Sequence, residues 1–460
     1  MKKNEFYEVQ IEDMGSNGEG IGKVDGFPLF IKDAILGDVV RAQITKVKKN
    51  YGFARVDTIV ASSKLRVEPA CPVARQCGGC QIQALQYESQ LAWKDKKVRN
   101  QLQRIAGIPK ETVERLMEAP IGATRQYRYR NKMTLPVGCD KSGRLISGFY
   151  AGRTHYIVEQ TDCMLGSQRA SQIMEQVLSY MNTYSVLAYD ETTGKGLVRH
   201  VLIREGESTG QVLVCLILNG TKLPQEEKLV ETLCAIAGMT SIMININTKQ
   251  TNVILGEETR VLWGQDHIVD MLNGLRFRIS PLSFYQVNHD QAERLYSKTL
   301  EYAGLTGKET VWDLYCGIGT ISLCLAKKAH RVYGVEIVPR AIEDARRNAQ
   351  DNQIDNAEFF VGKAEDVFPQ YMAEHPGVAD PDVVVVDPPR KGCDEKLLET
   401  MLRMGPKKIV YVSCDSATMA RDIAYLAKGG YTLKACCAVD QFCHTSHVET
   451  VCLMSRVEGK

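Results

Sequence analysis

Residues 310–329, TVWDLYCGIGTISLCLAKKA, decide the fold of the second half of the chain. An apolar run comes first, a turn containing Gly317 and Gly319 follows, and apolar residues at helical spacing come last. This order of strand, turn and helix is succeeded by further alternating strand and helix patterns towards residue 460. Such alternation predicts an α/β domain over residues 281–460, with a mostly parallel sheet covered by helices on both faces and an antiparallel pair at one edge.

Residues suited to ligand binding or catalysis lie at the ends of the predicted strands. Gly317 lies in the first turn, Glu336 ends GVE, Asp387 follows VVVV, and Cys414 follows IVYVS. Ligands of open α/β sheets bind beyond the carboxyl ends of the strands, where an acid such as Glu336 can accept hydrogen bonds from both ribose hydroxyls. Because the apolar strand has just ended, we interpret Cys414 as a candidate nucleophile and not as a small buried hydrophobic residue.

The first 60 residues alternate apolar and polar positions between closely spaced glycines, which predicts a small β-barrel. Basic residues surround Tyr51 and Phe53 between residues 41 and 55, a composition that suits RNA phosphates and stacked bases. A second basic and aromatic segment, ATRQYRYRNKMTLPVG, spans residues 123–138. Taken alone, each segment fits RNA binding and a strand with one solvated, charged face equally well.

Length and composition set the broad class. A chain of 460 residues suggests about three domains at roughly 150 residues each, and 44% hydrophobic residues allow sizeable cores. The net charge of +2 gives no overall bias towards nucleic acid, so any basic surface must be local. The N-terminus lacks the apolar core of a signal peptide and no stretch is long enough to span a membrane. We therefore expect a cytoplasmic protein, a monomer that binds no membrane.

The fifteen cysteines are not expected to form a disulfide framework in that compartment. Three of them cluster in CPVARQCGGC at Cys71, Cys77 and Cys80. Zinc sites more often contain two separated pairs, whereas three close cysteines and a distant fourth suit an iron–sulfur cluster. The spacing favours iron–sulfur and leaves zinc, or no metal at all, as alternatives.

Several motifs together resemble the RNA uracil-5 methyltransferase family, and the likeness extends over essentially the whole chain. They are YRNK (129–132), SFYQVN (283–288), DLYCGIGT (313–320), GVE (334–336), DPPR (387–390), YVSCDSATMARD (411–422) and HTSHVE (444–449). The N-terminal segment resembles the TRAM domain, an OB-like RNA-binding barrel. The resemblance implies a TRAM barrel over 1–60, a β-rich central domain carrying an iron–sulfur cluster over 61–280, and a Rossmann-like class I methyltransferase domain over 281–460. A helix over 84–107 is a candidate to pack on the catalytic domain.

The resemblance also implies a mechanism. Cys414 matches the nucleophile that adds to carbon 6 of uracil, and Glu449 matches the base that removes the proton from carbon 5. We expect the helix after Cys414 to favour its thiolate. The family positions that bind S-adenosylmethionine correspond to Gln286, Tyr315, Glu336 and Asp387. Lys363 departs from the family, which often carries Asp or Asn there, and a lysine cannot accept a hydrogen bond from adenine.

By the same resemblance the metal group is a 4Fe-4S cluster whose fourth ligand is Cys163, with Cys139 as the runner-up. A TRAM domain together with this cluster implies 23S rRNA as the substrate, and tRNA is the alternative. Two other classes fit less well. An amino-methyltransferase would carry an aromatic residue where Arg390 stands, and a non-catalytic RNA-binding or iron–sulfur protein would not need Cys414 and Glu449.

Overall fold

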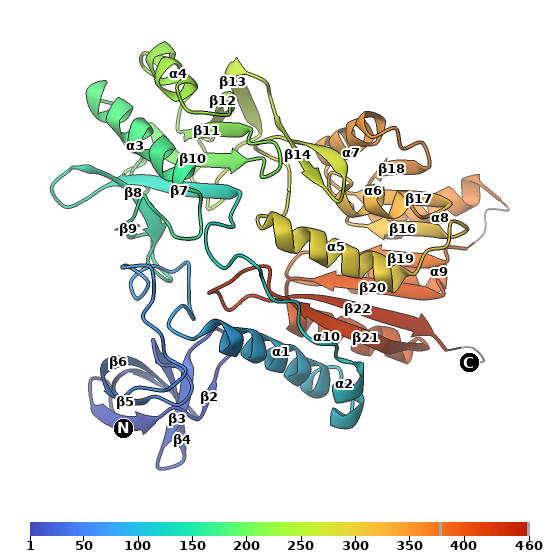
Figure 1. Ribbon diagram of the computed structural model, residues 1–460, viewed down its shortest axis with the longest axis horizontal. Helices are drawn as coiled ribbons and strands as arrows, with labels where there is room; N and C mark the ends of the chain where they lie inside the picture. The colour runs from blue at the N-terminus through green and yellow to red at the C-terminus, as the bar shows by residue number, and fades with distance from the viewer. Residues whose placement is uncertain (377–379, 458–460) are drawn as a thin grey trace.

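The computed structural model describes residues 1–376 and 380–457, and its strands form three large sheets and a hairpin (Figure 1). The first sheet has the order β1-β5-β6-β4-β3-β2, and its inward side chains form a small core that includes Leu29, Ile31, Val40 and Ile44. It confirms the N-terminal barrel that the glycine-punctuated pattern predicts. Its strands are β1 (Phe6–Gln10), β2 (Asp13–Met14), β3 (Gly20–Val24), β4 (Phe27–Lys32), β5 (Val39–Val47) and β6 (Gly52–Ala61).

The second sheet has the order β13-β12-β11-β10-β7-β8-β9, with helices α3 (Gln168–Thr183) and α4 (Glu226–Cys234) on one face. Its interior strand β11 is buried throughout because both faces are covered. Val212, Val214 and Leu216 pack under the two helices, whereas Leu213 and Cys215 join the core of the C-terminal half. The strands are β7 (Lys132–Cys139), β8 (Leu145–Tyr150), β9 (Ile157–Glu159), β10 (Val198–Glu205), β11 (Val212–Leu218), β12 (Met239–Ile246) and β13 (Glu258–Gly264). A hairpin of β14 (Ile268–Leu272) and β15 (Leu275–Ile279) follows.

The third sheet has the order β18-β17-β16-β19-β20-β22-β21. Its first five strands in this order are parallel, and β22 runs antiparallel to both of its neighbours. The α/β architecture and the antiparallel edge pair predicted from the sequence are therefore confirmed. The strands are β16 (Thr310–Leu314), β17 (Arg331–Glu336), β18 (Ala357–Val361), β19 (Val383–Val386), β20 (Lys408–Ser413), β21 (Tyr431–Val439) and β22 (Glu449–Arg456).

Helices cover both faces of the third sheet, as the alternation of its side chains requires. Val311, Val385 and Val410 pack against one set of helices, whereas Trp312 and Val384 pack against the other. The first set is α5 (His289–Ala303), α6 (Thr320–Ala326) and α7 (Pro339–Asp351), and the second is α8 (Ala364–Glu374), α9 (Glu395–Met404) and α10 (Ser416–Lys428). Local signals set helix ends. The side chain of Asp394 accepts a hydrogen bond from the amide of Leu397 at the start of α9, and Gly405 ends it in a left-handed conformation.

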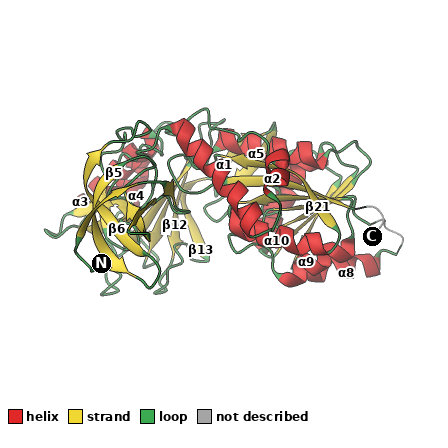
Figure 2. Cartoon of the chain, turned by 90° about the horizontal axis from the view of Figure 1, so that it is seen from below, coloured by secondary structure: helices red, strands yellow, loops and turns green. Residues whose placement is uncertain are grey.

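Helix α1 (Tyr87–Arg104) follows the first sheet in the chain but packs on the third. Figure 2 shows it running from the barrel towards α10 and β21. Val98 and Leu102 of α1 and Val113 of the short helix α2 (Lys110–Leu116) are buried in the core beneath α10. An early segment of the chain thus completes the last domain. Across the described ranges, no helix is both long and apolar enough to cross a membrane.

Candidate active site

The turn after β16 has the backbone geometry expected of a close approach to a ligand. Tyr315, Gly317 and Gly319 all have positive φ angles of 75°, 55° and 84°. The amide of Gly317 donates to a carboxylate oxygen of Glu336 at 3.3 Å, and the amide of Val338 donates to the other oxygen at 3.0 Å. The carboxylate at the end of β17 is therefore held beside the glycine turn.

Strand pairing gathers the predicted site residues at one edge of the sheet. Leu314, the last residue of β16, pairs with Val335 on one side and with Val386 on the other, and Val386 pairs with Tyr411. The glycine turn, Glu336, Asp387 and Cys414 directly follow or end these strands. All of them therefore lie at the carboxyl edge of the sheet, where the sequence pattern places them.

Cys414 and Glu449 come from neighbouring antiparallel strands. Ser413 at the end of β20 is the register partner of Thr450 in β22, and the hydroxyl of Thr450 donates to the carbonyl of Ser413 at 3.2 Å. Cys414 comes one position after Ser413, and Glu449 comes one position before Thr450. The register of this ladder therefore carries the thiol and the carboxyl group to facing positions. Glu449 is 3% exposed and Cys414 is partly exposed.

Burial raises the pKa of the acids in the site. Loss of water, together with the negative charge of Asp387 and against the positive charge of Arg390, raises the pKa of Glu449 to about 8. The same loss of water raises the pKa of Asp387 to about 6. Burial, followed by the negative charges of Glu449 and Asp387, raises the pKa of Cys414 to about 12, and Arg390 is the positive charge that opposes this rise. With a pKa of about 8, Glu449 is therefore largely protonated near neutral pH.

The expectation that α10 favours the thiolate is not met. Asp415 caps this helix, because its carboxylate accepts hydrogen bonds from the amides of Ala417 at 2.9 Å and Thr418 at 3.2 Å. These amides are the groups that would have stabilised a thiolate at the helix start. The negative charge of Asp415 also raises the pKa of Cys414. Asp415 is thus the N-cap that occupies the amides at the start of α10.

Gln286 is buried between two of the motifs. Its backbone oxygen accepts a hydrogen bond from the side chain of Asn131 at 3.0 Å, and its side-chain oxygen accepts one from Gln441 at 3.3 Å. The backbone amide of Asn131 also donates to the carbonyl of Val287 at 2.9 Å. The motifs YRNK and SFYQVN are therefore joined to each other and to the segment that precedes Glu449.

Lys363 is exposed at the position before α8. The amide of the preceding Gly362 donates to the carbonyl of Glu336 at 3.0 Å, so this segment lies next to the end of β17. Glu365 and Asp366 occupy the first turn of α8. Their carboxylates can accept hydrogen bonds, whereas the side chain of the neighbouring Lys363 cannot.

A buried acid that the sequence analysis missed lies beneath the glycine turn. Asp313 is fully buried in β16 and accepts a hydrogen bond from the hydroxyl of Ser322. Loss of water, together with the negative charges of Asp387 and Glu336 and against the hydrogen bond from Ser322, raises its pKa to about 7. A charged residue inside the apolar run TVWDL was the signal that could have identified it.

The four predicted cluster ligands, Cys71, Cys77, Cys80 and Cys163, line one cavity of about 270 Å³. Burial raises the pKa of Cys80 to about 12. The runner-up, Cys139, is exposed and does not line this cavity. Over residues 1–376 and 380–457, no three His, Cys, Asp or Glu side chains are grouped as ligands of a metal ion. The four thiols thus share a cavity without the compact arrangement of a single-ion site.

Two cations also line the cysteine cavity. They are Arg130 and Lys132, and within the described residues neither forms an ion pair with an acid. Burial, and then the nearby charges of Arg204 and Arg130, lower the pKa of Lys132 to about 8. The walls of the cavity are therefore electropositive, which suits a negatively charged occupant.

The second basic segment is partly engaged within the protein. Arg125 forms an ion pair with Glu207 at 2.7 Å, and Arg128 pairs with Asp162 at 2.5 Å. Tyr129 is fully buried. These residues tie the segment to other parts of the central domain and, through Asp290 and the carbonyl of Cys443, to the C-terminal domain.

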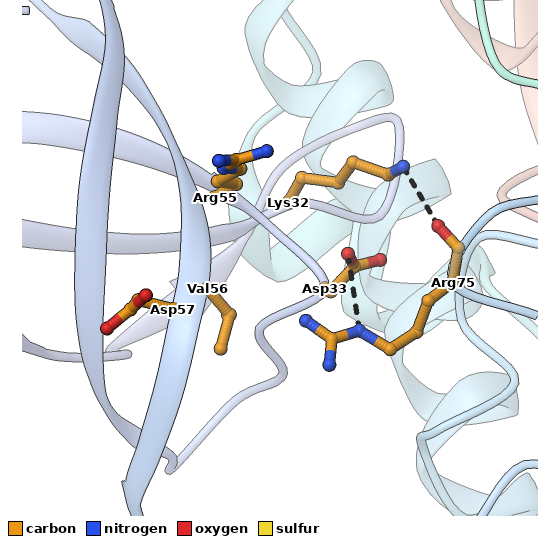
Figure 3. Close-up of a pocket in the computed structure, with 6 residues that line it drawn as sticks. All are labelled: Lys32, Asp33, Arg55, Val56, Asp57 and Arg75. Carbon is orange, nitrogen blue, oxygen red and sulfur yellow. Dashed lines mark hydrogen bonds and ion pairs between the residues drawn. The ribbon is translucent and has the colours of Figure 1, made fainter. Parts of the chain in front are cut away.

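The N-terminal barrel keeps an accessible basic and aromatic surface. Phe30, Tyr51 and Phe53 form an aromatic group, with Tyr51 meeting each of the other rings edge to face at centroid separations of 5.6 and 5.5 Å. Figure 3 shows an adjacent hollow of about 340 Å³ between the barrel and the loop that carries the cysteines. Its lining residues are Lys32, Asp33, Arg55, Val56, Asp57 and Arg75. This surface retains the composition suited to RNA.

Comparison with known proteins fits this arrangement. The family described as tRNA (Uracil-5-)-methyltransferase matches residues 86–457, and the TRAM domain matches residues 2–56. The chain belongs to the tRNA (uracil-5-)-methyltransferase family. The family match begins directly before α1, the helix that packs on the third sheet. This early segment is therefore part of what the family shares.

Relatives and solved structures cover nearly the whole chain. An uncharacterized RNA methyltransferase of Halalkalibacterium halodurans is 48% identical over 455 residues, which cover 99% of this chain and 98% of the relative. One of Clostridium tetani is 46% identical over 456 residues, covering 99% and 97%. The crystal structure of Pyrococcus abyssi tRNA (uracil-54, C5)-methyltransferase in complex with S-adenosyl-L-homocysteine has a TM-score of 0.77 and 29% identity, and the match covers 97% of this chain and 99% of that one.

Proposed function

We propose that this protein methylates carbon 5 of a uridine in 23S rRNA, with Cys414 as the nucleophile and Glu449 as the base. The observation that carries the proposal is the register of β20 and β22, which brings these two residues to facing positions at the carboxyl edge of the sheet. Membership in the family supplies the reaction class. Carbon 5 of uracil is a poor nucleophile, and addition of a thiolate to carbon 6 turns the ring into an enolate that can react.

Arg390 supports the addition step. The thiol of Cys414 must lose its proton before its sulfur can bond to carbon 6, yet burial and the acids beside it raise its pKa to about 12. Arg390 is the positive charge that opposes this rise, and it also holds Glu449 towards its ionised form. We assign Arg390 to stabilise the thiolate when the uracil ring enters.

Glu449 completes the reaction. Its carboxylate takes the proton from carbon 5, the electrons of that bond form the double bond between carbons 5 and 6, and the bond from carbon 6 to sulfur breaks. Cys414 leaves as a thiolate and is ready for another cycle. Because the pKa of Glu449 is about 8, its ionised form grows across the neutral range.

Gln286, Tyr315, Glu336 and Asp387 would hold S-adenosylmethionine. When bound, this cofactor supplies the methyl group that carbon 5 accepts. The residues present fit it, because the carboxylate of Glu336 is fixed at a strand end beside a glycine turn, where it can meet ribose hydroxyls. The Pyrococcus abyssi enzyme was solved with the product form of this cofactor, which supports the assignment.

Cys71, Cys77, Cys80 and Cys163 would hold a 4Fe-4S cluster. The common cavity and its electropositive walls fit a group that is negatively charged when four thiolates bind it. Methyl transfer moves no electrons, so the role we propose for the group is to hold the cysteine-bearing loop in shape. The adjacent barrel surface would grip RNA while a single uridine is flipped into the site.

A second candidate substrate is tRNA. The Pyrococcus abyssi enzyme, whose match covers nearly all of both chains, acts on uracil 54 of tRNA. We place ribosomal RNA first because the TRAM barrel and the cysteine set occur together in this chain, a combination that resembles the ribosomal enzymes of the family. One experiment distinguishes the two substrates.

The test uses RNA in which 5-fluorouracil replaces uracil. Fluorine at carbon 5 cannot be removed as a proton, so the covalent product on Cys414 persists. We expect an adduct with ribosomal RNA that survives denaturation in the presence of S-adenosylmethionine and is absent in Cys414→Ala. An adduct that persists in this variant, or none with either RNA, would refute the mechanism. An adduct with tRNA alone would refute only the ribosomal substrate.

A further inference from the structure

The loop between β21 and β22, residues 440–448, leads directly into Glu449 and is anchored by an early part of the chain. Lys94 of α1 forms a fully buried ion pair with Asp440 at 2.5 Å and donates to the carbonyl of Phe442 at 2.8 Å. Lys97 donates to the carbonyl of Ser446 at 2.8 Å. The position of the loop therefore depends on residues that lie far from it in the sequence.

Gln81 joins this loop to the cysteine-bearing segment. It follows Cys80 directly, and its side-chain nitrogen donates to the carbonyl of Gly78 at 2.8 Å, within that segment. Its side-chain oxygen accepts a hydrogen bond from the amide of Ser446 at 3.1 Å, three positions before Glu449. One amide group thus contacts both the cysteine segment and the catalytic loop.

The backbone reinforces the connection at His444. The amides of Gln81 and Ile82 both donate to its carbonyl, at 3.0 and 3.1 Å, and its own amide donates to the side chain of Gln90 at 3.0 Å. His444 adopts a positive φ of 67°, which a residue with a side chain rarely takes up. Its ring stacks on Tyr127 at a centroid separation of 4.4 Å. The loop is therefore held in a conformation that it would not adopt unaided.

We propose that Gln81 is a positioning residue for Glu449, and that its contact with Ser446 sets the rate of the last step of the reaction. This inference rests on the proposed function. Glu449 must stand within reach of the proton on carbon 5 once the covalent intermediate has formed. Loss of the Gln81 contact leaves Ser446 held, among the described residues, by Lys97 alone and lets the carboxyl group of Glu449 shift, which slows the removal of that proton. Addition of Cys414 to carbon 6 comes earlier and does not need this contact.

The test compares three variants on two RNAs. Gln81→Leu removes both side-chain contacts, whereas Gln81→Glu keeps the oxygen that accepts from Ser446. Gln76→Leu is the matched control, because Gln76 lies in the same segment, is exposed, and makes no side-chain hydrogen bond within the described residues. With ordinary uridine RNA, we expect Gln81→Leu to accumulate a denaturant-stable methylated adduct whose breakdown is slowed by about 10- to 100-fold.

Two further measurements separate positioning from general damage. With 5-fluorouracil RNA, Gln81→Leu should form its adduct as fast as wild type, which shows that the fold and Cys414 are intact. Hydrogen exchange of residues 440–448 should speed up in Gln81→Leu and stay unchanged in Gln81→Glu and Gln76→Leu, whether or not RNA is present. Gln81→Glu should also break down the ordinary adduct at the wild-type rate.

Each outcome decides the inference. Normal breakdown of the ordinary adduct by Gln81→Leu, or slow breakdown by Gln81→Glu, would overturn it while leaving the proposed function in place. If Gln81→Leu does not fold, Gln81→Ala, which removes the same two side-chain contacts, takes its place in both measurements. Absence of a 5-fluorouracil adduct in wild type would refute the proposed function instead.

Discussion

Cys414 and Glu449 face each other one position beyond the last register pair of β20 and β22. A negative charge on one of these residues makes the other harder to ionise, since the negative charge of Glu449 raises the pKa of the thiol. Addition needs the thiolate, whereas elimination needs the carboxylate. The pair can therefore serve both steps if a single negative charge occupies one residue and then the other.

Replacing Glu449 by Gln should stop the reaction after methyl transfer. The amide cannot take the proton from carbon 5, so the bond between Cys414 and carbon 6 cannot break. We expect a denaturant-stable adduct on ordinary uridine RNA, visible as a shifted band in gel electrophoresis. Glu258→Gln is the control, because Glu258 is exposed at the start of β13. Turnover by Glu449→Gln near the wild-type rate would rule out this base.

The breakdown of the adduct should depend on pH through Glu449. Burial raises the pKa of this carboxyl group to about 8, so it is mostly protonated below that pH and accepts no further proton. In single-turnover experiments between about pH 6 and 9, we expect the breakdown rate to rise with pH and to level off above about 8. A rate that falls as pH increases would contradict the assignment.

The buried acid Asp313 should make stability fall as pH rises. Its folded-state pKa of about 7 lies above the ordinary value of 3.8, so its protonated form stabilises the fold at low pH. That contribution is lost as pH rises through about 7. Asp313→Asn cannot ionise, so relative to this variant wild type should lose on the order of 2–4 kcal/mol of unfolding free energy between pH 4 and 8. Urea unfolding at both pH values measures this, and the exposed Asp25→Asn should follow wild type.

The ion pair between Lys94 and Asp440 should be sensitive to the loss of one partner. Both side chains are fully buried, so Lys94→Met leaves an uncompensated carboxylate and should cost about 3–5 kcal/mol of unfolding free energy. Adding Asp440→Asn to this variant should recover part of the loss. Lys96→Met is the control, because its ion pair with Asp13 is exposed and worth about 0–1 kcal/mol. Equal losses in the two single variants would contradict this account.

The cysteines that line the cavity should bind iron in the purified protein. After anaerobic purification we expect iron, sulfide and a broad visible absorption in wild type, all lost in Cys163→Ser. Cys139→Ser should retain them, because Cys139 is exposed and does not line the cavity. Iron retained in Cys163→Ser and lost in Cys139→Ser would reverse the choice of the fourth ligand.

The positions of the site residues could be predicted because local patterns determine them. Alternating strands and helices specify a parallel sheet, and the carboxyl ends of adjacent parallel strands meet at one edge. Glu336, Asp387 and Cys414 were therefore expected together before any contact was known. The aromatic and basic barrel surface is likewise encoded within a few neighbouring residues.

Contacts between distant segments could not be predicted in this way. Lys94 lies in a run of charged residues and resembles a surface lysine, yet its partner is 346 positions away. Arg125 and Arg128 looked available for RNA because their acidic partners come from other parts of the chain. The expectation that the helix after Cys414 favours its thiolate was wrong for a local reason. The side chain of Asp415 caps the start of this helix and accepts the hydrogen bonds that would have stabilised the thiolate.

The packing of α1 beneath α10 also bears on how the protein is made. α1 emerges from the ribosome well before β21 and β22, which have Asp440 between them. Until then Val98 and Leu102 have no core to enter, and Lys94 has no partner. The methyltransferase domain therefore reaches its native packing only after residues 431–456 have been synthesised, although the N-terminal barrel can close long before.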